Sequence, residues 1–175
     1  DNSAAHNITI KNLYTYGVQW EHANSAAGGG PLTVDGGVIV SDLDWYPYIG
    51  AKNWQAGMSV RNLQIVGKRA IAYWPQTMSA QWADNNQYHV LSPSSEQAPF
   101  VGGGGPVYKT FPAWQATGND ANSTYSTALP PAPRIEVIER AQDKVVIVYN
   151  WNNAVSVIAP ISGLYRNAMN PSEVQ

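Results

Sequence analysis

The sequence predicts an all-β protein, most simply a two-sheet antiparallel sandwich or jelly roll with long loops. Short segments alternate apolar and polar residues, as strands with one buried face do. No stretch of 12 residues has an apolar stripe with the helical period unless Gly or Pro interrupts it. Pro and Gly are frequent, with 12 and 15 of 175 residues, which is typical of many turns. The length fits one domain, so we expect residues 1–175 to form a single β domain.

The alternation places each expected strand in turn. Residues 134–140 and 144–151 are the clearest pair, because a tight connection at 141–143 joins them into a hairpin. The other expected strands are 7–16, 34–40 around a Gly36-Gly37 turn, 59–66, 70–74 and 154–158. The apolar positions of these segments predict the core, which we expect to comprise Ile8, Ile10, Val38, Val40, Val60, Ile135, Val137, Val146, Val148, Val155 and Val157.

The region from about residue 76 to 133 has a different composition. It is rich in Pro and Gly, with a Gly run at 102–105 and the sequence Pro-Pro-Ala-Pro at 130–133. It also contains seven large aromatic residues, which a solvated linker would not carry. We expect long loops packed on a sheet, with short strands near 87–91 and 106–111. The alternative is a disordered connector between two small sheets.

One outline recurs along the chain: apolar, any, apolar, any, Asn or Asp, then Leu or Trp. It occurs at 8–13, 38–43, 58–63 and 146–151. An Asn that faces the same side as two apolar residues can bond to the following turn, as the ladder of a stacked coil requires. A short right-handed parallel β-helix is therefore the alternative fold. The segment Ile-Thr-Ile-Lys-Asn-Leu at 8–13 resembles a rung of pectate-lyase-like β-helices, which implies a polysaccharide hydrolase or lyase, or a fragment of one.

Composition excludes several classes of protein. Lys and Arg number 10 and Asp and Glu 12, a net charge of −2, which argues against a nucleic-acid binder held by phosphate contacts. No apolar run is long enough to span a bilayer as a helix. Cys is absent, so there are no disulfides or thiolate sites. The three His residues lack metal-ligand spacing, and we expect neither a metal nor a cofactor.

The densest aromatic cluster predicts a recognition surface. Trp and Tyr beside Asp and Asn suit a sugar ring, since the aromatic covers the apolar C–H face while the polar groups bond the hydroxyls. The same residues also suit a protein interface. A second polar and aromatic group follows between loop signals, where binding residues are often placed. The candidate ligand-binding residues are Asp42, Asp44, Trp45, Tyr46, Tyr48, Asn53 and Trp54 from the first group and Trp82 and Tyr88 from the second.

No catalytic motif accompanies these residues. A Gly-x-Ser-x-Gly sequence is absent, and the Gly runs lack the Lys and Ser or Thr of a phosphate loop. Asp42 and Asp44 share a strand face, but 12 acidic residues always offer some such pair. We therefore expect a non-enzymatic module that recognises carbohydrate through an aromatic-rich loop surface, with no catalytic residue.

Two features suggest where such a module acts. The chain starts at Asp1 rather than Met, as a processed chain or fragment does, and glycosylation acceptor patterns begin at Asn7 and Asn122. We expect a secreted protein whose partner is a glycan or a second copy of itself. The alternative is a self-assembling viral coat or extracellular filament subunit released by proteolysis, which would place it in a virion or filament.

Overall fold

The computed structural model describes residues 8–16, 20–22, 32–41, 49–51, 59–67, 71–73, 82–91, 100–101 and 108–151. The chain divides into two compact units, residues 1–129 and 130–175. The boundary coincides with the Pro-rich sequence at 130–133, where the sequence analysis placed only the end of a loop region.

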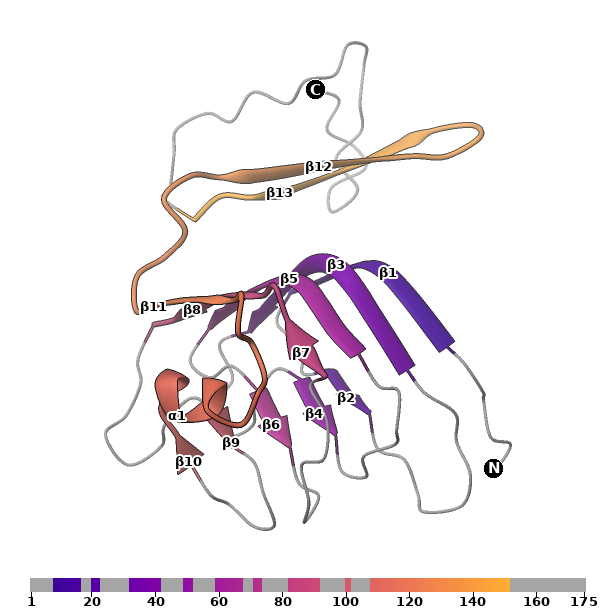
Figure 1. The fold of residues 1–175 in the computed structure, drawn as a ribbon. Coiled ribbons are helices and arrows are strands. Elements are labelled where there is room, and N and C mark those ends of the chain that lie inside the picture. The colour runs from indigo at the N-terminus through magenta and orange to yellow at the C-terminus, as the bar shows by residue number, and fades with distance from the viewer. Residues whose placement is uncertain are drawn as a thin grey trace. The chain divides into compact units, whose positions relative to one another are not determined.

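Unit 1 contains two sheets in which almost all neighbouring strands run parallel (Figure 1). The first sheet has the order β1-β3-β5-β8-β11, with β7 also paired to β5, and the second has the order β10-β9-β6-β4-β2. The strands of the first sheet are β1 (Ile8–Tyr16), β3 (Leu32–Ser41), β5 (Ser59–Gly67), β7 (Ala83–Asp84), β8 (Gln87–Val90) and β11 (Thr124–Ser126). Those of the second are β2 (Trp20–His22), β4 (Ile49–Ala51), β6 (Ile71–Tyr73), β9 (Phe100–Val101) and β10 (Tyr108–Lys109).

The chain alternates between these sheets from β1 to β6, so that each turn of the chain adds one strand to each sheet. We call each such turn of the chain a coil. Every pair described in unit 1 is parallel except β9–β10, which is antiparallel. The mostly-β prediction is confirmed, but the antiparallel sandwich or jelly roll is not. The described strands form parallel sheets in unit 1 and an antiparallel pair in unit 2.

Strand register reveals a repeat that the recurring sequence outline captured only in part. Ile10 pairs with Val34, Val34 with Val60 and Val60 with Ala83, at intervals of 24, 26 and 23 residues. The outlines at 8–13 and 58–63 therefore occupy equivalent positions. The outline at 38–43 does not, because Val38 pairs with Tyr14 of β1.

A residue with a positive φ angle stands at the same register position in β1, β3 and β5 and between β7 and β8. Asn12, Asn62 and Asn85 have φ angles of 54°, 59° and 56°, and Gly36 has 79° at the position between Asn12 and Asn62. Asn and Gly tolerate this conformation better than other residues do. The turn expected at 36–37 is therefore a bend within β3.

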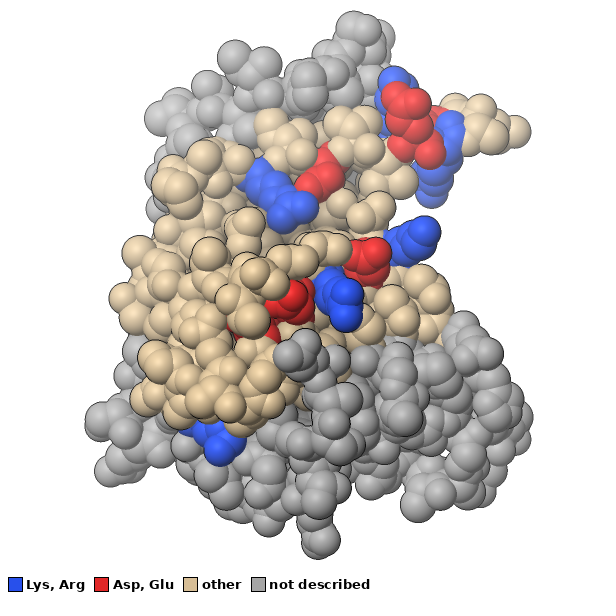
Figure 2. Space-filling view, in the orientation of Figure 1, with Lys and Arg blue, Asp and Glu red and all other residues tan. Residues whose placement is uncertain are grey.

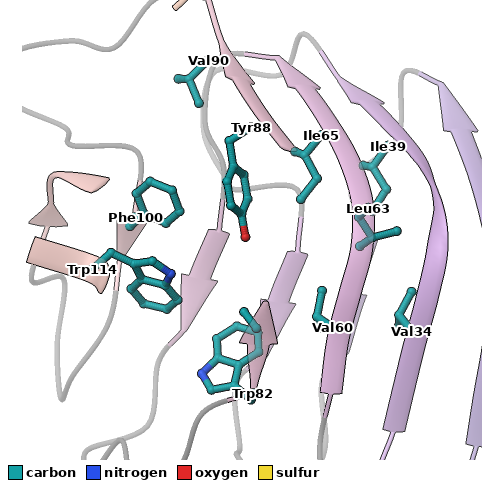
Figure 3. Packing of buried hydrophobic residues seen from close by; sticks show 11 residues of the cluster. Val34, Ile39, Val60, Leu63, Ile65, Trp82, Tyr88, Val90, Phe100 and Trp114 are labelled. Carbon is teal, nitrogen blue, oxygen red and sulfur yellow. The ribbon is translucent and has the colours of Figure 1, made fainter. Parts of the chain in front are cut away.

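The core of unit 1 lies inside this coil. Val34, Val60 and Ile65 are at most 1% exposed and come from neighbouring strands (Figure 3). The Pro- and Gly-rich region supplies the aromatic part of the same core, so its described portion is packed rather than a disordered connector. The fully buried aromatic residues are Trp82, Tyr88, Phe100 and Trp114. The expected strand near 87–91 is confirmed as β8, and β10 covers two residues of 106–111.

One short helix, α1 (Phe111–Gln115), was not expected. Thr110 caps it by accepting a hydrogen bond from the backbone N–H of Ala113, and Pro112 occupies the first turn, where its missing N–H costs nothing. Its Phe111 ring stacks on Tyr125 of β11, with centroids 5.4 Å apart. The helix therefore covers the interior of the last coil.

Unit 2 contains the expected hairpin. Strands β12 (Arg134–Glu139) and β13 (Lys144–Tyr149) pair antiparallel, and Arg140 and Asp143 close the turn through a backbone hydrogen bond of 2.8 Å and a side-chain ion pair. Its apolar residues are less buried than the sequence analysis predicted. Ile135, Val137 and Val146 are half-buried, and Val148 is 45% exposed.

The remaining core predictions have mixed outcomes. Val38 and Val60 are buried, Ile10 and Val40 are half-buried, and Val155 and Val157 lie outside the described residues. Ile8 was expected in the core but is 38% exposed, because it starts β1, the outermost strand of its sheet.

Candidate functional site

The most ordered exposed feature is a row of alternating charges across the first sheet. Lys11, Asp35, Arg61 and Asp84 occupy successive register positions on β1, β3, β5 and β7. Each follows an inward-facing apolar residue, so alternation along the strand turns it outward. Figure 2 shows blue and red side chains alternating over these strands. We call these four residues the charge column.

A second row lies directly beside the first. Asn12, Gly36, Asn62 and Asn85 each follow a member of the charge column, and we call them the bend column. The three Asn side chains are exposed. Because neighbouring strands lie about 4.8 Å apart, the column presents amide groups in one row across the sheet, with a gap at Gly36.

Hydrogen bonds connect the two columns from one coil to the next. Asn62 Nδ2 donates to Asp35 Oδ1 at 2.6 Å. Asn122, at the corresponding place before β11, donates to Asp84 through both its backbone N–H and its Nδ2, each at 2.9 Å. An Asp of one coil thus accepts from an Asn of the following coil in both cases.

These bonds affect the ionisation of Asp84. The Asn122 side chain and then its backbone N–H stabilise the carboxylate, and together they hold the pKa of Asp84 below its ordinary value of 3.8. Arg61 contributes a smaller effect in the same direction. The carboxylate is therefore ionised at neutral pH and presents its remaining lone pairs to solvent.

The two columns together form a polar face with hydrogen-bond donors and acceptors in a repeating array. Asn supplies both kinds of group, Asp accepts, and Lys and Arg donate. The backbone conformation places each Asn in the row, so the backbone needs no rearrangement when a ligand binds. A flexible polar chain that carries many hydroxyl groups can bond to such an array.

A second polar cluster is buried and serves the core. Asp120, with no exposed surface, accepts hydrogen bonds from Trp114 Nε1 (2.6 Å), Tyr88 Oη (2.9 Å), Asn86 Nδ2 (3.0 Å) and Ser123 Oγ (2.5 Å). These four donors satisfy the carboxylate, as a buried charge requires. Burial and then the Asp120 charge raise the pKa of Tyr88 well above 10.

The structure places two predicted ligand-binding residues in this core. Trp82 and Tyr88 are each 1% exposed (Figure 3), and the rings of Trp82 and Trp114 meet edge to face with centroids 5.8 Å apart. They do not lie on a recognition surface, because the loop signals around them mark the ends of buried strands. The other candidates, Asp42, Asp44, Trp45, Tyr46, Tyr48, Asn53 and Trp54, lie outside the described residues.

Sequence reasoning missed the charge column, although a signal for it is present. Lys11-Asn12 and Arg61-Asn62 occur within the two equivalent outlines, and Asp35-Gly36 and Asp84-Asn85 lie between and after them. Aligning the chain at intervals of 23 to 26 residues would have revealed the alternation. The outline at 38–43 hid this period because it is out of register.

Across the described ranges, no three His, Asp or Glu side chains gather as metal ligands. His89 Nδ1 lies 2.8 Å from the carbonyl oxygen of Ala128. In the described part of the chain there is no helix with the length and apolarity needed to cross a membrane.

Comparisons with protein-family models, with curated proteins and with solved structures found no match to this chain. The geometry of the polar face is therefore the basis on which a function can be proposed.

Proposed function

We propose that unit 1 is a parallel β-helix and that the protein is a secreted, non-enzymatic module that binds carbohydrate. The polar face of the first sheet forms part of the binding surface, and the aromatic residues at 45–54 supply the stacking contacts. A polysaccharide would lie across the strands, so that successive coils bond to successive sugar units.

The observation that carries this proposal is the bend column. Asn12, Asn62 and Asn85 hold exposed amides in one row, fixed by a backbone conformation that is the same in all three. Amide and carboxylate groups in a rigid row can form paired hydrogen bonds to neighbouring hydroxyls. The low net charge of −2 fits a neutral or weakly charged glycan better than a polyanion.

Asp84, a member of the charge column, does not fit the acid role in hydrolysis. A glycosidase needs one carboxyl group with a raised pKa, so that it can donate a proton at neutral pH. The pKa of Asp84 is lowered instead. Asp84 would therefore not be the proton donor of a polysaccharide enzyme, which is the other candidate and which assays for released sugar would test.

The test is binding to a panel of soluble polysaccharides, measured by affinity electrophoresis and then by calorimetry on those that bind. We expect at least one to bind the wild-type chain. Asn62→Gly and Asn85→Gly keep the left-handed backbone while removing the amide, so each should weaken binding about three- to tenfold without changing the fold. Trp54→Ala tests the aromatic contribution in the same assay.

Gln142→Ala, in the exposed turn of the hairpin, is the matched control and should bind like the wild type. Circular dichroism of every variant checks that the fold is unchanged. If no polysaccharide binds the wild type, or if the two Gly variants bind as well as the control does, the polar face is not a carbohydrate site.

Self-assembly as a coat or filament subunit is the second candidate, and the hairpin favours it. A two-stranded hairpin is marginal in stability when isolated, yet Ile138 and Val148 of β12 and β13 are 37% and 45% exposed. Light scattering during size-exclusion chromatography, over a wide concentration range, tests this. A species many times 19.0 kDa supports assembly, and a monomer at all concentrations contradicts it.

A further inference from the structure

The two ends of the first sheet differ. At the β11 end, α1 covers the coil: Trp114 is fully buried and Phe111 packs on Tyr125. At the other end, β1 is the outermost strand, and no described strand pairs with it on the side away from β3. Coils that stack need a cap or a further coil at each end, because an uncovered strand edge exposes backbone hydrogen-bonding groups.

The first half of β1 carries Asn12, whose equivalents in two later coils donate a hydrogen bond to an acidic residue. Asn62 and Asn122 each donate to an Asp of the preceding coil, namely Asp35 and Asp84. Asn12 has the place of Asn62 in the first described coil and is exposed. By the same pattern, the acidic residue that would accept from Asn12 would belong to a strand on the outer side of β1.

Lys11 gives the same indication independently. Each neighbouring pair of the charge column joins opposite charges, Lys11 with Asp35, Asp35 with Arg61, and Arg61 with Asp84. Opposite charges facing each other across neighbouring strands stabilise a pair, whereas like charges destabilise it. Continuing the alternation past Lys11 requires an acidic residue.

We propose that the Ile8–Leu13 edge of β1 binds a parallel β-strand of another polypeptide, with an acidic residue in register with Lys11. That carboxylate would accept from Asn12 Nδ2 as Asp35 accepts from Asn62, and apolar residues on either side would cover Ile10 and Leu13. Strand addition of this kind takes its affinity from backbone hydrogen bonds and its specificity from alternate side chains. The proposal does not depend on carbohydrate binding.

A peptide of residues 32–41 is a suitable probe, because β3 already pairs with β1 in this register on the other side and carries Asp35 opposite Lys11. Fluorescence anisotropy with the labelled peptide and the full chain should give saturable binding. Hydrogen exchange should slow at amides of β1 and remain unchanged in β3, which distinguishes addition at the outer edge from displacement of β3.

Charge exchange provides the matched controls. Lys11→Glu should weaken binding of the peptide at least about fivefold, and a second peptide with Lys in place of Asp should prefer the Lys11→Glu protein. Asn12→Gly retains the bend and removes the amide, so it should weaken binding about two- to fivefold. Thermal unfolding of each variant shows whether the fold is retained.

Any of the following results would overturn the proposal: no saturable binding to the wild type, equal affinity of both peptides for the wild type, or protection that appears in β3 instead of β1. A dimer of the wild type alone that persists in Lys11→Glu would also overturn it, since the edge would then be occupied by a second copy without an acidic contact.

Discussion

Gly37 follows the bend column and shows how closely two coils approach at one residue. Its φ angle is 122°, a conformation that other residues rarely adopt. A Cβ atom built there would lie 2.0 Å from the carbonyl oxygen of Leu13 and 2.5 Å from its backbone N. Backbone atoms cannot move aside as a flexible side chain can, so only Gly fits between β1 and β5 at this position.

We therefore predict that Gly37→Ala destabilises the protein by about 2–4 kcal/mol, measured as the free energy of unfolding in urea. Gly36→Asn is the matched control. A Cβ at Gly36 would meet only the end of the Asn12 side chain at 2.9 Å, and Asn occupies the same column in neighbouring coils. Equal losses in the two variants would contradict the close approach at Gly37.

At the scale of the element, side chains join one coil to the next. Asp84 of β7 accepts two hydrogen bonds from Asn122, which precedes β11, and its pKa is lowered by them. A lowered pKa in the folded state means that the hydrogen bonds to Asp84 stabilise the fold at pH values above the ordinary pKa of 3.8. That contribution disappears as the pH falls through the folded-state pKa.

We predict that the wild type exceeds Asp84→Asn in melting temperature at pH 7 and that this difference shrinks between about pH 5 and pH 3. Asn122→Ala removes the side-chain donor of the pair, so its melting temperature should change less with pH over the same range than that of the wild type. Thermal unfolding followed by circular dichroism measures all three proteins. A difference that grows on acidification would mean that Asp84 is not the group that titrates.

The elements also show which sequence signals are reliable. The hairpin of unit 2 was predicted correctly because both strands and their turn are contiguous, so local alternation determines the pairing. In unit 1 the same alternation identified β1, β3 and β5 as strands but did not indicate which strands pair with them. Parallel partners lie 23 to 26 residues apart, and alternation within one strand contains no information about that distance.

At the scale of the whole molecule, the chain has two units, and the described residues of unit 1 form an aromatic core. The buried members of that core lie between residues 34 and 114. The described part of unit 2 contains a hairpin, and two strands alone rarely form a stable structure in water. The units should therefore differ in how well each folds when it is separated from the other.

We predict that a fragment of residues 1–129 unfolds cooperatively and keeps the β-sheet signal in circular dichroism, because it contains the whole core and the α1 cap. A fragment of residues 130–175 should show little ordered structure. If residues 1–129 are unfolded on their own while the full chain is folded, unit 1 depends on unit 2 for its stability.

The sequence by itself determined the strand content, the hairpin and the positions of several core residues, since these follow from local alternation and turn residues. It also indicated, through the outlines at 8–13 and 58–63, that Asn ends a repeated unit. Only the tertiary structure decided that the sheets are parallel, that Trp82 and Tyr88 belong to the core, and that Lys11, Asp35, Arg61 and Asp84 form one column. The physical reason is that strand register is set by packing between coils, where a side chain meets residues far away in the chain.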